Sequence, residues 1–378
     1  MFQSSPATFL DADERSHIAC ERAVSELRYG RPILIEGQDT TYAVLALDTA
    51  TPDTFDRFAA MAGEKYTLFV TRARAAVLDI DAPSGVFFAI DGIGYEEATA
   101  LAYGTSAGPL PGWQPALQQS PTFERLARAA LLLPAFICLA VESGDPRFEG
   151  CARLSADTFD HTPAAEGNFA IVARTRVPLK DIAAAEFVVF RGGVAQRDQV
   201  AIIVGNLDVT QPVPVRIHSS CLTGDLFGSL KCDCGDQLRE GMLLLEQRGG
   251  GILLYLDQEG RGTGIAAKMR AYGYQHQGLD TVDADAILGF EDDGRRYDAA
   301  VAMLTALGVG SVELLTNNPR KLKALEAAGF AVHRRTPVIG LVTAENRNYL
   351  ETKARRSGHL LDVDTMRQYA LRADQAAE

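Results

Sequence analysis

Cysteine, tryptophan and long apolar runs are all scarce in this sequence. Six cysteines and one tryptophan occur among 378 residues, and the cysteines are too unevenly spread for the disulfide framework of a small secreted protein. The longest apolar run, residues 129–141, is interrupted by Pro134 and is well short of the roughly 20 residues that span a bilayer. The N-terminus lacks the basic and apolar regions of a signal peptide. We therefore expect a soluble cytoplasmic protein.

Positive charge is also scarce. The 37 lysines and arginines stand against 49 aspartates and glutamates, and the net charge is −12. This balance argues against a broad nucleic-acid surface, so a bound anion would need a local cluster of arginine and lysine. Hydrophobic residues make 47% and charged residues 23% of the chain, which is ordinary for a globular protein and excludes a disordered one. At roughly 100–200 residues per domain, the length predicts two or three domains.

The order of expected helices and strands predicts an α/β fold with two domains. Strands expected in residues 1–170 alternate with helices expected at 20–27, 54–62, 96–103 and 123–133. Residues 171–378 begin with a β-rich stretch and then alternate strand and helix. This second pattern predicts a mixed β plus α/β domain with ligand loops at the carboxyl ends of its strands. The polar segment 142–167, which lacks steady periodicity, puts the boundary near residue 170.

Half of the cysteines are clustered: Cys221, Cys232 and Cys234 fall within fourteen residues. Three thiolates leave the fourth tetrahedral position of a zinc ion open, as in catalytic sites, where zinc lowers the pKa of bound water to about 7. Two other interpretations stay open, because His218 would close a structural site as a fourth ligand and the cysteines would also suit a core. The Cys-x-Cys pair fits one face of a strand, although its flanking residues also favour a turn.

Basic residues gather in or beside the loops expected in the second domain. They are Arg216, Lys231, Arg261, Arg295, Arg296, Arg320 and Lys321. Arginine binds phosphate oxygens bidentately, and lysine acts as a point charge. Residues 316–319 lead into a helix N-terminus, a natural anion site. Residues 257–262 match neither the P-loop nor the dinucleotide fingerprint, but Glu259 could read a base edge and Arg261 a phosphate. Each residue alone would also suit a solvated surface; together they predict an anion site.

The motifs of the second domain resemble the GTP cyclohydrolase II family over about residues 180–362. The resemblance is carried by Arg216-Ile-His-Ser-Ser-Cys221-Leu-Thr-Gly-Asp225, Cys232-Asp-Cys-Gly-Asp-Gln237, Asp257-Gln-Glu-Gly-Arg-Gly262, Arg270-Ala-Tyr272, Asp280-Thr281, Leu288-Gly-Phe290, Asp293-x-Arg295 and Leu315-Thr-Asn-Asn-Pro-Arg-Lys321. It implies hydrolysis of GTP with loss of C8 as formate and release of pyrophosphate. The product would be 2,5-diamino-6-(5-phosphoribosylamino)pyrimidin-4-one, in the first step of riboflavin biosynthesis. The resemblance also implies magnesium with GTP, a homodimer, and one zinc ion per subunit, held by the three clustered cysteines, whose water attacks C8.

The resemblance also implies roles for other residues. Tyr272 would assist at the zinc site, and Asp293 would accept a proton. Arg295 is the family's proposed nucleophile at the α-phosphate. A guanidinium, with a pKa above about 12, rarely loses its proton, so electrostatic stabilisation is the alternative role. The residues implied to contact GTP are Arg216, Ile217, His218, Ser219, Ser220, Gln237, Glu259, Gly260, Arg261, Thr281, Thr316 and Lys321.

One departure from the family's pattern lies beside a predicted zinc ligand. Ser220 stands where the family usually has glutamate, which removes a carboxylate next to Cys221. The change predicts altered affinity for GTP or magnesium, or a variant subgroup that acts in another pathway. Tyr272 is retained, which favours the complete reaction including formate release.

The first domain resembles the 3,4-dihydroxy-2-butanone 4-phosphate synthases that are often fused upstream of this enzyme. The similar segments are residues 23–35, 87–91 and 126–142. The family's acidic, magnesium-binding stretch is replaced by Glu36-Gly-Gln-Asp39, and its Gly-His-Thr-Glu segment by residues 118–123, which contain no histidine. We therefore predict that residues 1–170 are a non-catalytic domain and that residues 171–378 form the cyclohydrolase domain.

Two alternatives remain for the whole chain. One is a bifunctional enzyme that also makes 3,4-dihydroxy-2-butanone 4-phosphate from ribulose 5-phosphate. The other is a zinc-stabilised nucleotide sensor without turnover. The set of Tyr272, Asp293 and Arg295 argues against the sensor, because a protein that only binds would not need these groups.

Overall fold

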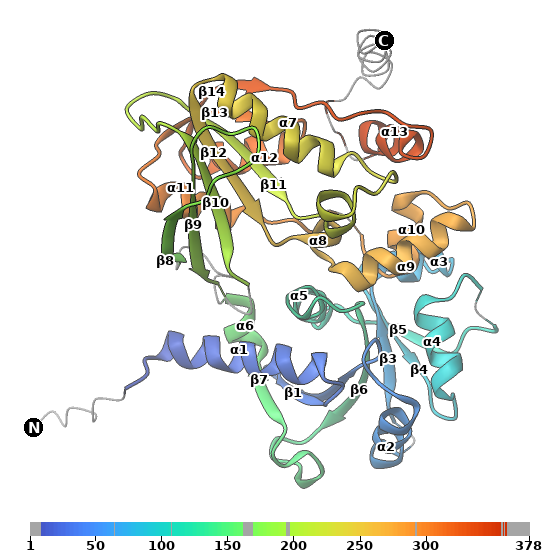
Figure 1. Ribbon diagram of the computed structural model, residues 1–378. Helices are drawn as coiled ribbons and strands as arrows, with labels where there is room; N and C mark the ends of the chain where they lie inside the picture. The colour runs from blue at the N-terminus through green and yellow to red at the C-terminus, as the bar shows by residue number, and fades with distance from the viewer. Residues whose placement is uncertain are drawn as a thin grey trace, which may run out of the picture. The chain divides into compact units, whose positions relative to one another are not determined.

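The chain forms two compact units, each built on one sheet of seven strands (Figure 1). A computed structural model describes residues 9–63, 65–106, 108–161, 169–193, 197–291, 293–356, 358 and 360. The first unit comprises Met1–Ala164 and Asp285–Glu291, and the second comprises Ala165–Ala284 and Asp292–Glu378. The predicted fold class, two α/β domains of which the second has a mixed sheet, is confirmed. Among the described residues, no helix combines the length and apolar character that a membrane crossing needs.

The first unit has a mostly antiparallel sheet in the order β5-β4-β3-β6-β2-β1-β7, in which β1 and β7 pair in parallel. Its strands are β1 (Ile33–Glu36), β2 (Thr41–Ala46), β3 (Thr67–Val70), β4 (Val86–Ala89), β5 (Trp113–Pro115), β6 (Ala135–Val141) and β7 (Ala152–Ser155). Its helices are α1 (Ala12–Arg28), α2 (Pro52–Ala62), α3 (Arg72–Val77), α4 (Tyr95–Tyr103), α5 (Ser120–Ala130) and α6 (Ala156–His161), with a short 3-10 turn at Pro146–Phe148. Helix α1 packs against α5 and β7 (Figure 1).

Two helices of the first unit begin at threonine caps. The Thr51 hydroxyl accepts from the backbone N–H of Thr54 at the start of α2, and the two residues form a capping box. The Thr71 hydroxyl accepts from Arg74 N at 3.3 Å at the start of α3. Such a cap satisfies an N–H group that the helix leaves unpaired and contributes about 1 kcal/mol. Both helices therefore begin at a threonine whose hydroxyl accepts from the N–H three residues further on.

The second unit has a sheet in the order β14-β13-β11-β12-β10-β9-β8. Its strands are β8 (Phe169–Arg176), β9 (Ala185–Gly192), β10 (Gln199–Gly205), β11 (Val213–Ser219), β12 (Gly250–Leu256), β13 (Ser311–Leu315) and β14 (Ala331–Thr336). Strands β14, β13, β11 and β12 are parallel, whereas β10, β9 and β8 continue the sheet in antiparallel pairs. The sheet is therefore mixed, with a parallel half and an antiparallel half.

Helices cover both faces of this second sheet. The described helices that follow β8 in the chain are α7 (Cys234–Gln247), α8 (Glu259–Gly262), α9 (Ile265–His276), α10 (Thr281–Ile287), whose last three residues belong to the first unit, α11 (Asp298–Ala306), α12 (Pro319–Ala327) and α13 (Arg347–Arg355), with a π-helical turn at Leu222–Leu226. In β12, Ile252 and Leu254 share a core with α11. Leu253, which lies between them, shares a core with Leu245 of α7. Since successive strand residues face opposite sides, α11 and α7 lie on opposite faces.

Three parallel strands of this sheet end next to predicted site residues. Strand β11 ends two residues before Cys221, β12 ends before the loop at 257–264, and β13 ends directly before Thr316. The carboxyl ends of parallel strands meet at one edge of a sheet. The predicted loops therefore leave the sheet at its carboxyl edge.

Several short elements were not predicted from the sequence. In the first unit they are α3, β5, β7 and α6, each of six residues or fewer. After residue 165 they are β8, α8, α10 and α13, of which α8 is a four-residue helical turn within the predicted loop 257–264. The Cys-x-Cys pair does not lie on a strand, because Cys234 is the first residue of α7. The alternative of a turn that presents both sulfur atoms is the one that the structure supports.

Candidate metal centre and its surroundings

The three clustered cysteines come together at the carboxyl edge of the second sheet. The sulfur atoms of Cys221, Cys232 and Cys234 all lie within 4.8 Å of one another. The Cys221 and Cys232 sulfurs are 3.7 Å apart. Tetrahedral zinc with bonds of about 2.3 Å to sulfur places two sulfurs about 3.8 Å apart. The donor set and its spacing therefore fit one zinc ion with a fourth position open.

Two glycines let the segments that carry these cysteines approach each other. A Cβ on Gly224 would lie 2.9 Å from the Cys232 sulfur and 3.1 Å from the Cys221 sulfur. A Cβ on Gly235 would lie 2.2 Å from the carbonyl oxygen of Gly224. The distances of 2.9 Å and 2.2 Å are shorter than packed atoms tolerate. The space between the sulfurs exists because neither position carries a side chain.

Lys268 of α9 faces this cluster. Its Nζ lies 3.1 Å from the Cys221 sulfur, 3.0 Å from Thr223 Oγ1 and 2.8 Å from Glu259 Oε1. Burial opposes the charged form of Lys268, but the bond to Glu259 and the charge of Cys221 raise its pKa above the ordinary value. Hydrogen bonds from Cys232 and Cys234, together with Lys268, lower the pKa of the Cys221 thiol. Lys268 therefore places a positive charge next to the Cys221 sulfur.

Asp225 fixes the backbone of this metal ligand. Its Oδ2 accepts from Cys221 N and from Tyr255 OH, both at 2.9 Å. His218 Nε2 lies 3.1 Å from the same oxygen, and the His218 ring stacks on Tyr255 with centroids 5.5 Å apart. Burial lowers the pKa of His218. His218 thus contacts Cys221 through Asp225, and within the described part of the chain the three cysteines are the side chains grouped closely enough to hold a metal ion.

A buried polar chain continues from the turn between Cys232 and Cys234. Asp233 Oδ1 lies 3.0 Å from Lys353 Nζ, and Asp233 Oδ2 accepts from Gln237 Nε2 at 2.5 Å. Gln237 Oε1 accepts from Arg216 Nη2 at 2.8 Å, and Arg216 Nη1 donates to the Leu315 carbonyl at 3.1 Å. Burial lowers the pKa of Arg216 to about 10. Its Nε is buried without a hydrogen-bond partner in the described part of the chain.

A second charged group follows the loop after α10. Arg295 Nε donates to Asp293 Oδ1 at 2.8 Å, its backbone N donates to the same oxygen at 3.1 Å, and Nη2 contacts Oδ2. Burial opposes ionisation of Asp293, but the hydrogen bonds from Arg295 lower its pKa to about 2. The same pairing raises the pKa of Arg295. Arg320 Nη1 also donates to the Asp293 carbonyl at 2.7 Å. The pair is therefore a carboxylate and a guanidinium, both charged.

The loop after β12 contacts both groups. Glu259 Oε2 accepts from the backbone N of Leu222 at 2.6 Å, next to Cys221. Three residues further on, a Cβ on Gly262 would lie 3.2 Å from the Gly294 carbonyl oxygen, between Asp293 and Arg295. Gly260 and Arg261 adopt left-handed φ values of +62° and +61°. A tight turn thus connects the sulfur cluster to the acid–arginine pair.

Tyr272 and Thr281 lie at and after α9. Lys231 Nζ is 5.2 Å and Lys268 Nζ 5.7 Å from the centre of the Tyr272 ring. Burial raises the pKa of Tyr272, so its hydroxyl keeps its proton at neutral pH. The Thr281 hydroxyl, at the start of α10, accepts from Gln275 Nε2 at 3.3 Å. The structure therefore places Tyr272 beside the basic residues of the cluster.

Other residues expected to contact GTP are held by hydrogen bonds along the carboxyl edge. Lys321 Nζ donates to the Ile217 carbonyl at 2.7 Å, and Thr316 Oγ1 accepts from Asn318 N at 3.0 Å. Burial lowers the pKa of Lys321 well below its ordinary value. These contacts bring the ends of β11 and β13 together.

Ser219 and Ser220 are tied to the loop after β12. Ser219 Oγ lies 3.3 Å from Gln258 Oε1, and Ser220 Oγ accepts from Gln258 N at 3.1 Å. Ser220 N donates to the Leu256 carbonyl at 2.8 Å. The residue that replaces the family's usual glutamate therefore joins two loops beside Cys221.

Sequence reasoning gave no role to four residues of this site. Lys268 precedes Tyr272 by four positions, so both lie on one face of α9, and that spacing was a usable signal. Asp225 follows Cys221 by four residues and lies within the motif that carries the family resemblance. Asp233 and Lys353 meet across 120 residues, a distance at which sequence periodicity carries no signal.

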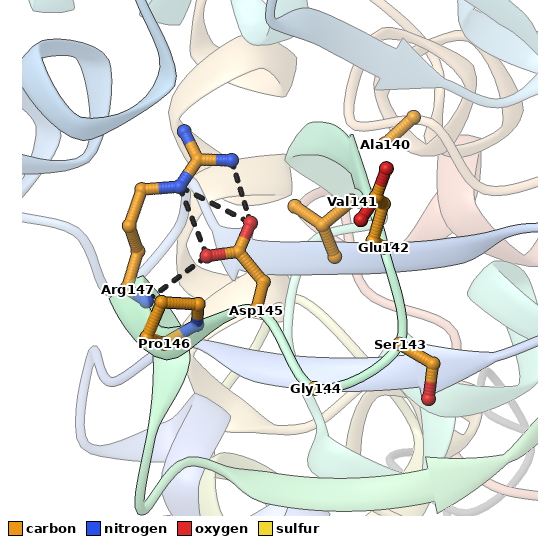
Figure 2. A pocket seen from close by; sticks show the side chains of 8 residues that line it. All are labelled: Ala140, Val141, Glu142, Ser143, Gly144, Asp145, Pro146 and Arg147. Atoms are coloured by element: carbon orange, nitrogen blue, oxygen red, sulfur yellow. Dashed lines mark hydrogen bonds and ion pairs between the residues drawn. The ribbon is translucent and has the colours of Figure 1, made fainter.

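The first unit contains an open pocket lined by Ala140–Arg147 (Figure 2). Figure 2 shows the Arg147 guanidinium against the Asp145 carboxylate, with Nη2 2.6 Å from Oδ2. Hydrogen bonds from Arg147 lower the pKa of Asp145. The wall of this pocket belongs to one continuous turn, and its Asp145 carboxylate already has a cation. We assign it no ligand.

The fold and the site together define a two-domain α/β protein with a cluster of three cysteines whose spacing fits a zinc ion. A profile of the GTP cyclohydrolase II family matches residues 170–337. The GTP cyclohydrolase-2 of Xylella fastidiosa (strain 9a5c) is 50% identical over 353 residues, which cover 92% of this chain and 89% of that protein. The GTP cyclohydrolase-2 of Azospirillum brasilense is 38% identical over 373 residues, covering 94% and 97%. The chain belongs to the GTP cyclohydrolase II family.

Among solved structures, a two-domain 3,4-dihydroxy-2-butanone 4-phosphate synthase from A. baumannii covers 84% of this chain and 98% of that chain. Its sequence identity is 15% and its TM-score is 0.32, which is too low to establish a shared fold. The resemblance of the first unit to these synthases stays a prediction.

Proposed function

We propose that this protein is a GTP cyclohydrolase II that opens the imidazole ring of the guanine of GTP. It releases formate and pyrophosphate and leaves 2,5-diamino-6-(5-phosphoribosylamino)pyrimidin-4-one, in the first step of riboflavin biosynthesis. Family membership supports the reaction. The observation that carries the proposal to this chain is the cluster of Cys221, Cys232 and Cys234. Zinc held there supplies the Lewis acidity that makes water a nucleophile near neutral pH.

In this proposal Lys268, Glu259 and Asp225 keep the sulfur cluster in place. The ammonium of Lys268 offsets the charge of the Cys221 thiolate. Glu259 accepts a hydrogen bond from the backbone N–H of Leu222, and Asp225 accepts one from the backbone N–H of Cys221. Tyr272, which keeps its proton, donates a hydrogen bond to a reacting oxygen. A donor whose pKa is raised remains a donor throughout the neutral range.

Asp293 and Arg295 serve the triphosphate end of GTP. The pairing with Asp293 raises the pKa of Arg295 and keeps the guanidinium charged, which favours electrostatic stabilisation of the α-phosphate over nucleophilic attack. A carboxylate with a pKa of about 2 is a weak proton acceptor. Asp293 therefore accepts a proton only after bound GTP draws Arg295 away from it.

The remaining contacts to GTP follow the carboxyl edge of the sheet. We assign them to Arg216, Ile217, His218, Ser219, Ser220, Gln237, Glu259, Gly260, Arg261, Thr281, Thr316 and Lys321. Magnesium accompanies the triphosphate, and the working form is a homodimer. Because Ser220 replaces a carboxylate next to Cys221, we expect weaker binding of magnesium at this point.

The first domain, residues 1–170, is proposed to be non-catalytic. Its sequence lacks the acidic and histidine segments of the synthases that it resembles. The test is to measure consumption of ribulose 5-phosphate by the full chain with magnesium. Any turnover above that of a heat-inactivated sample would make the protein bifunctional.

The central experiment measures formate and pyrophosphate released from GTP by the purified full chain, with its zinc content determined alongside. Cys232→Ser should lose zinc and both products. Cys138→Ser is the control, because Cys138 is also buried but lies in β6 of the first unit, and it should keep both. A zinc-loaded protein that binds GTP but releases no formate would be a nucleotide sensor.

A further inference from the structure

A segment far along the chain belongs to the first unit. Residues 285–291 follow the second unit's residues 165–284 in sequence, yet they form one compact body with residues 1–164. Their apolar side chains are deeply buried, since Ile287, Leu288 and Phe290 are 5%, 1% and 4% exposed. This segment, residues 285–291, is called here the anchor segment. Asp293 follows its last residue by two positions.

Thr71 holds the middle of the anchor segment. Its Oγ1 donates to the Gly289 carbonyl at 2.6 Å, across 218 residues of sequence. Gly289 has a φ of +88°, and a Cβ there would lie 3.0 Å from Pro134 Cγ and 3.3 Å from Thr71 Oγ1. The close approach and the left-handed backbone both require glycine at this position. Gly289 is therefore fitted to the surface formed by Thr71 and Pro134.

Arg74, one turn further along α3, lies at the same place. It is 1% exposed, and its Nε and Nη2 donate to the carbonyls of Leu101 at 2.9 Å and Ala100 at 3.2 Å. Its Nη1 lies 3.5 Å from the Ile287 carbonyl oxygen. A guanidinium buried on carbonyl oxygens has few other arrangements open to it. Two side chains of one short helix start thus contact two carbonyls of the anchor segment.

The anchor restricts the residues that follow it. A chain spans at most about 3.6 Å per residue, so Asp293 lies within about 15 Å of Gly289 wherever the loop runs. Because Gly289 is fixed in the folded protein, the loop that follows it has less conformational entropy left to lose when substrate binds. A loop fixed before GTP arrives needs less ordering to present Asp293 and Arg295.

We propose that Thr71 and Arg74 are positioning residues for Asp293 and Arg295, which they act on through the anchor segment. The first unit is predicted to have no catalytic activity of its own. In this proposal it supports the reaction of the second unit, because it holds the anchor segment that leads to Asp293 and Arg295. This inference rests on the proposed function for its effect on turnover. The hold on the loop itself can be measured without any turnover.

The first test compares GTP turnover by three variants of the full chain. Thr71→Ala removes both the cap of α3 and the bond to Gly289, and should lower kcat by about 10- to 100-fold. Thr51→Ala is the matched control, because it removes the cap of α2 and should leave kcat near that of the wild type. Thr71→Ser keeps the hydroxyl and should restore kcat. Zinc content should be the same in Thr71→Ala and Thr51→Ala, whereas Thr71→Ala, which also loses a buried hydrogen bond, should melt at the lower temperature.

The second test measures deuterium uptake by peptides covering residues 285–297 in the same variants. Thr71→Ala should speed exchange at Asp293 and Arg295, whereas Thr51→Ala and Thr71→Ser should not. Equal uptake in Thr71→Ala and Thr51→Ala overturns the inference, and so does faster uptake with unchanged kcat. If the wild type itself releases no formate, the proposed function fails, and exchange alone then decides whether the loop is held.

Discussion

Lys353 Nζ lies 3.0 Å from Asp233 Oδ1, inside the turn that separates two proposed zinc ligands. Asp233 is 0% exposed and Lys353 is 8% exposed, so water does not replace either partner. Burial opposes the charged form of Lys353, but Asp233 raises its pKa above the ordinary value. Helix α13 is thereby tied to the Cys-x-Cys turn by a buried ion pair.

Replacement of Lys353 should loosen the metal centre. Lys353→Met leaves Asp233 buried without its cation, which costs about 3–5 kcal/mol of unfolding free energy. Denaturant unfolding and the rate of zinc loss to a chelator measure the two effects. Arg355→Met is the control, because Arg355 is exposed on the same helix. Equal zinc loss in the two variants would show that the pair does not support the site.

Gly224→Ala should lose zinc while keeping its fold. The added Cβ would lie 2.9 Å from the Cys232 sulfur, so the sulfurs must move apart. Gly273→Ala is the matched control, since a Cβ there meets nothing within 4 Å and alanine favours a helix by up to about 1 kcal/mol. Zinc per chain and far-ultraviolet circular dichroism provide the readouts. Full zinc content in Gly224→Ala would contradict the proposed placement of the ion.

Arg295 should carry no covalent nucleotide during turnover, because a guanidinium, with a pKa above about 12, keeps its proton even when bound GTP draws it away from Asp293. Mass spectrometry of acid-quenched protein checks this prediction, and an adduct on the peptide that holds Arg295 would establish the nucleophile. Arg295→Lys should lower kcat by about 100-fold, as loss of a preorganised donor does. Arg296→Lys should stay near the wild type, since Arg296 is an exposed residue paired with Asp298.

The Asp293–Arg295 pair should contribute to the free energy of unfolding at neutral pH and lose this contribution in acid. The pKa of Asp293 is about 2 in the folded protein and about 3.9 when unfolded. Because the folded state binds this proton less tightly, the contribution is complete above about pH 5 and falls as pH drops toward 2. It amounts to about 2–3 kcal/mol. The unfolding free energy of the wild type minus that of Asp293→Asn should shrink over this range, and a constant difference would refute the pairing.

The zinc ligands could be predicted from the sequence because Cys221, Cys232 and Cys234 are close in the chain and share one chemistry. The two-residue spacing of Cys232 and Cys234 does not distinguish a strand from a turn, because both structures would place the two sulfur atoms on the same side. Elements such as β5, with three residues, are too short to show a period.

Contacts between segments that are far apart in the chain could not be predicted from the sequence. Thr71 reaches Gly289 across 218 residues and Lys353 reaches Asp233 across 120. In the local sequence, Thr71 is a common helix cap and Gly289 a common turn residue. Lys353 and Asp233 are likewise residues that usually lie on a surface. Only the folded chain makes them neighbours, and neither a motif nor a hydrophobic pattern marks them.

The direction of the parallel strands gives the second sheet a carboxyl edge, which carries the proposed site, and an opposite edge, which does not. Strands β11, β12 and β13 all point their carboxyl ends toward the proposed site, while the connection at 206–212 joins β10 to the amino end of β11. Gly205, the last residue of β10, pairs with Gly250 at the start of β12. An affinity tag or fluorescent label inserted at 206–212 would therefore sit a full strand length from the sulfur cluster, which makes this loop the place to immobilise the protein for ligand-binding measurements.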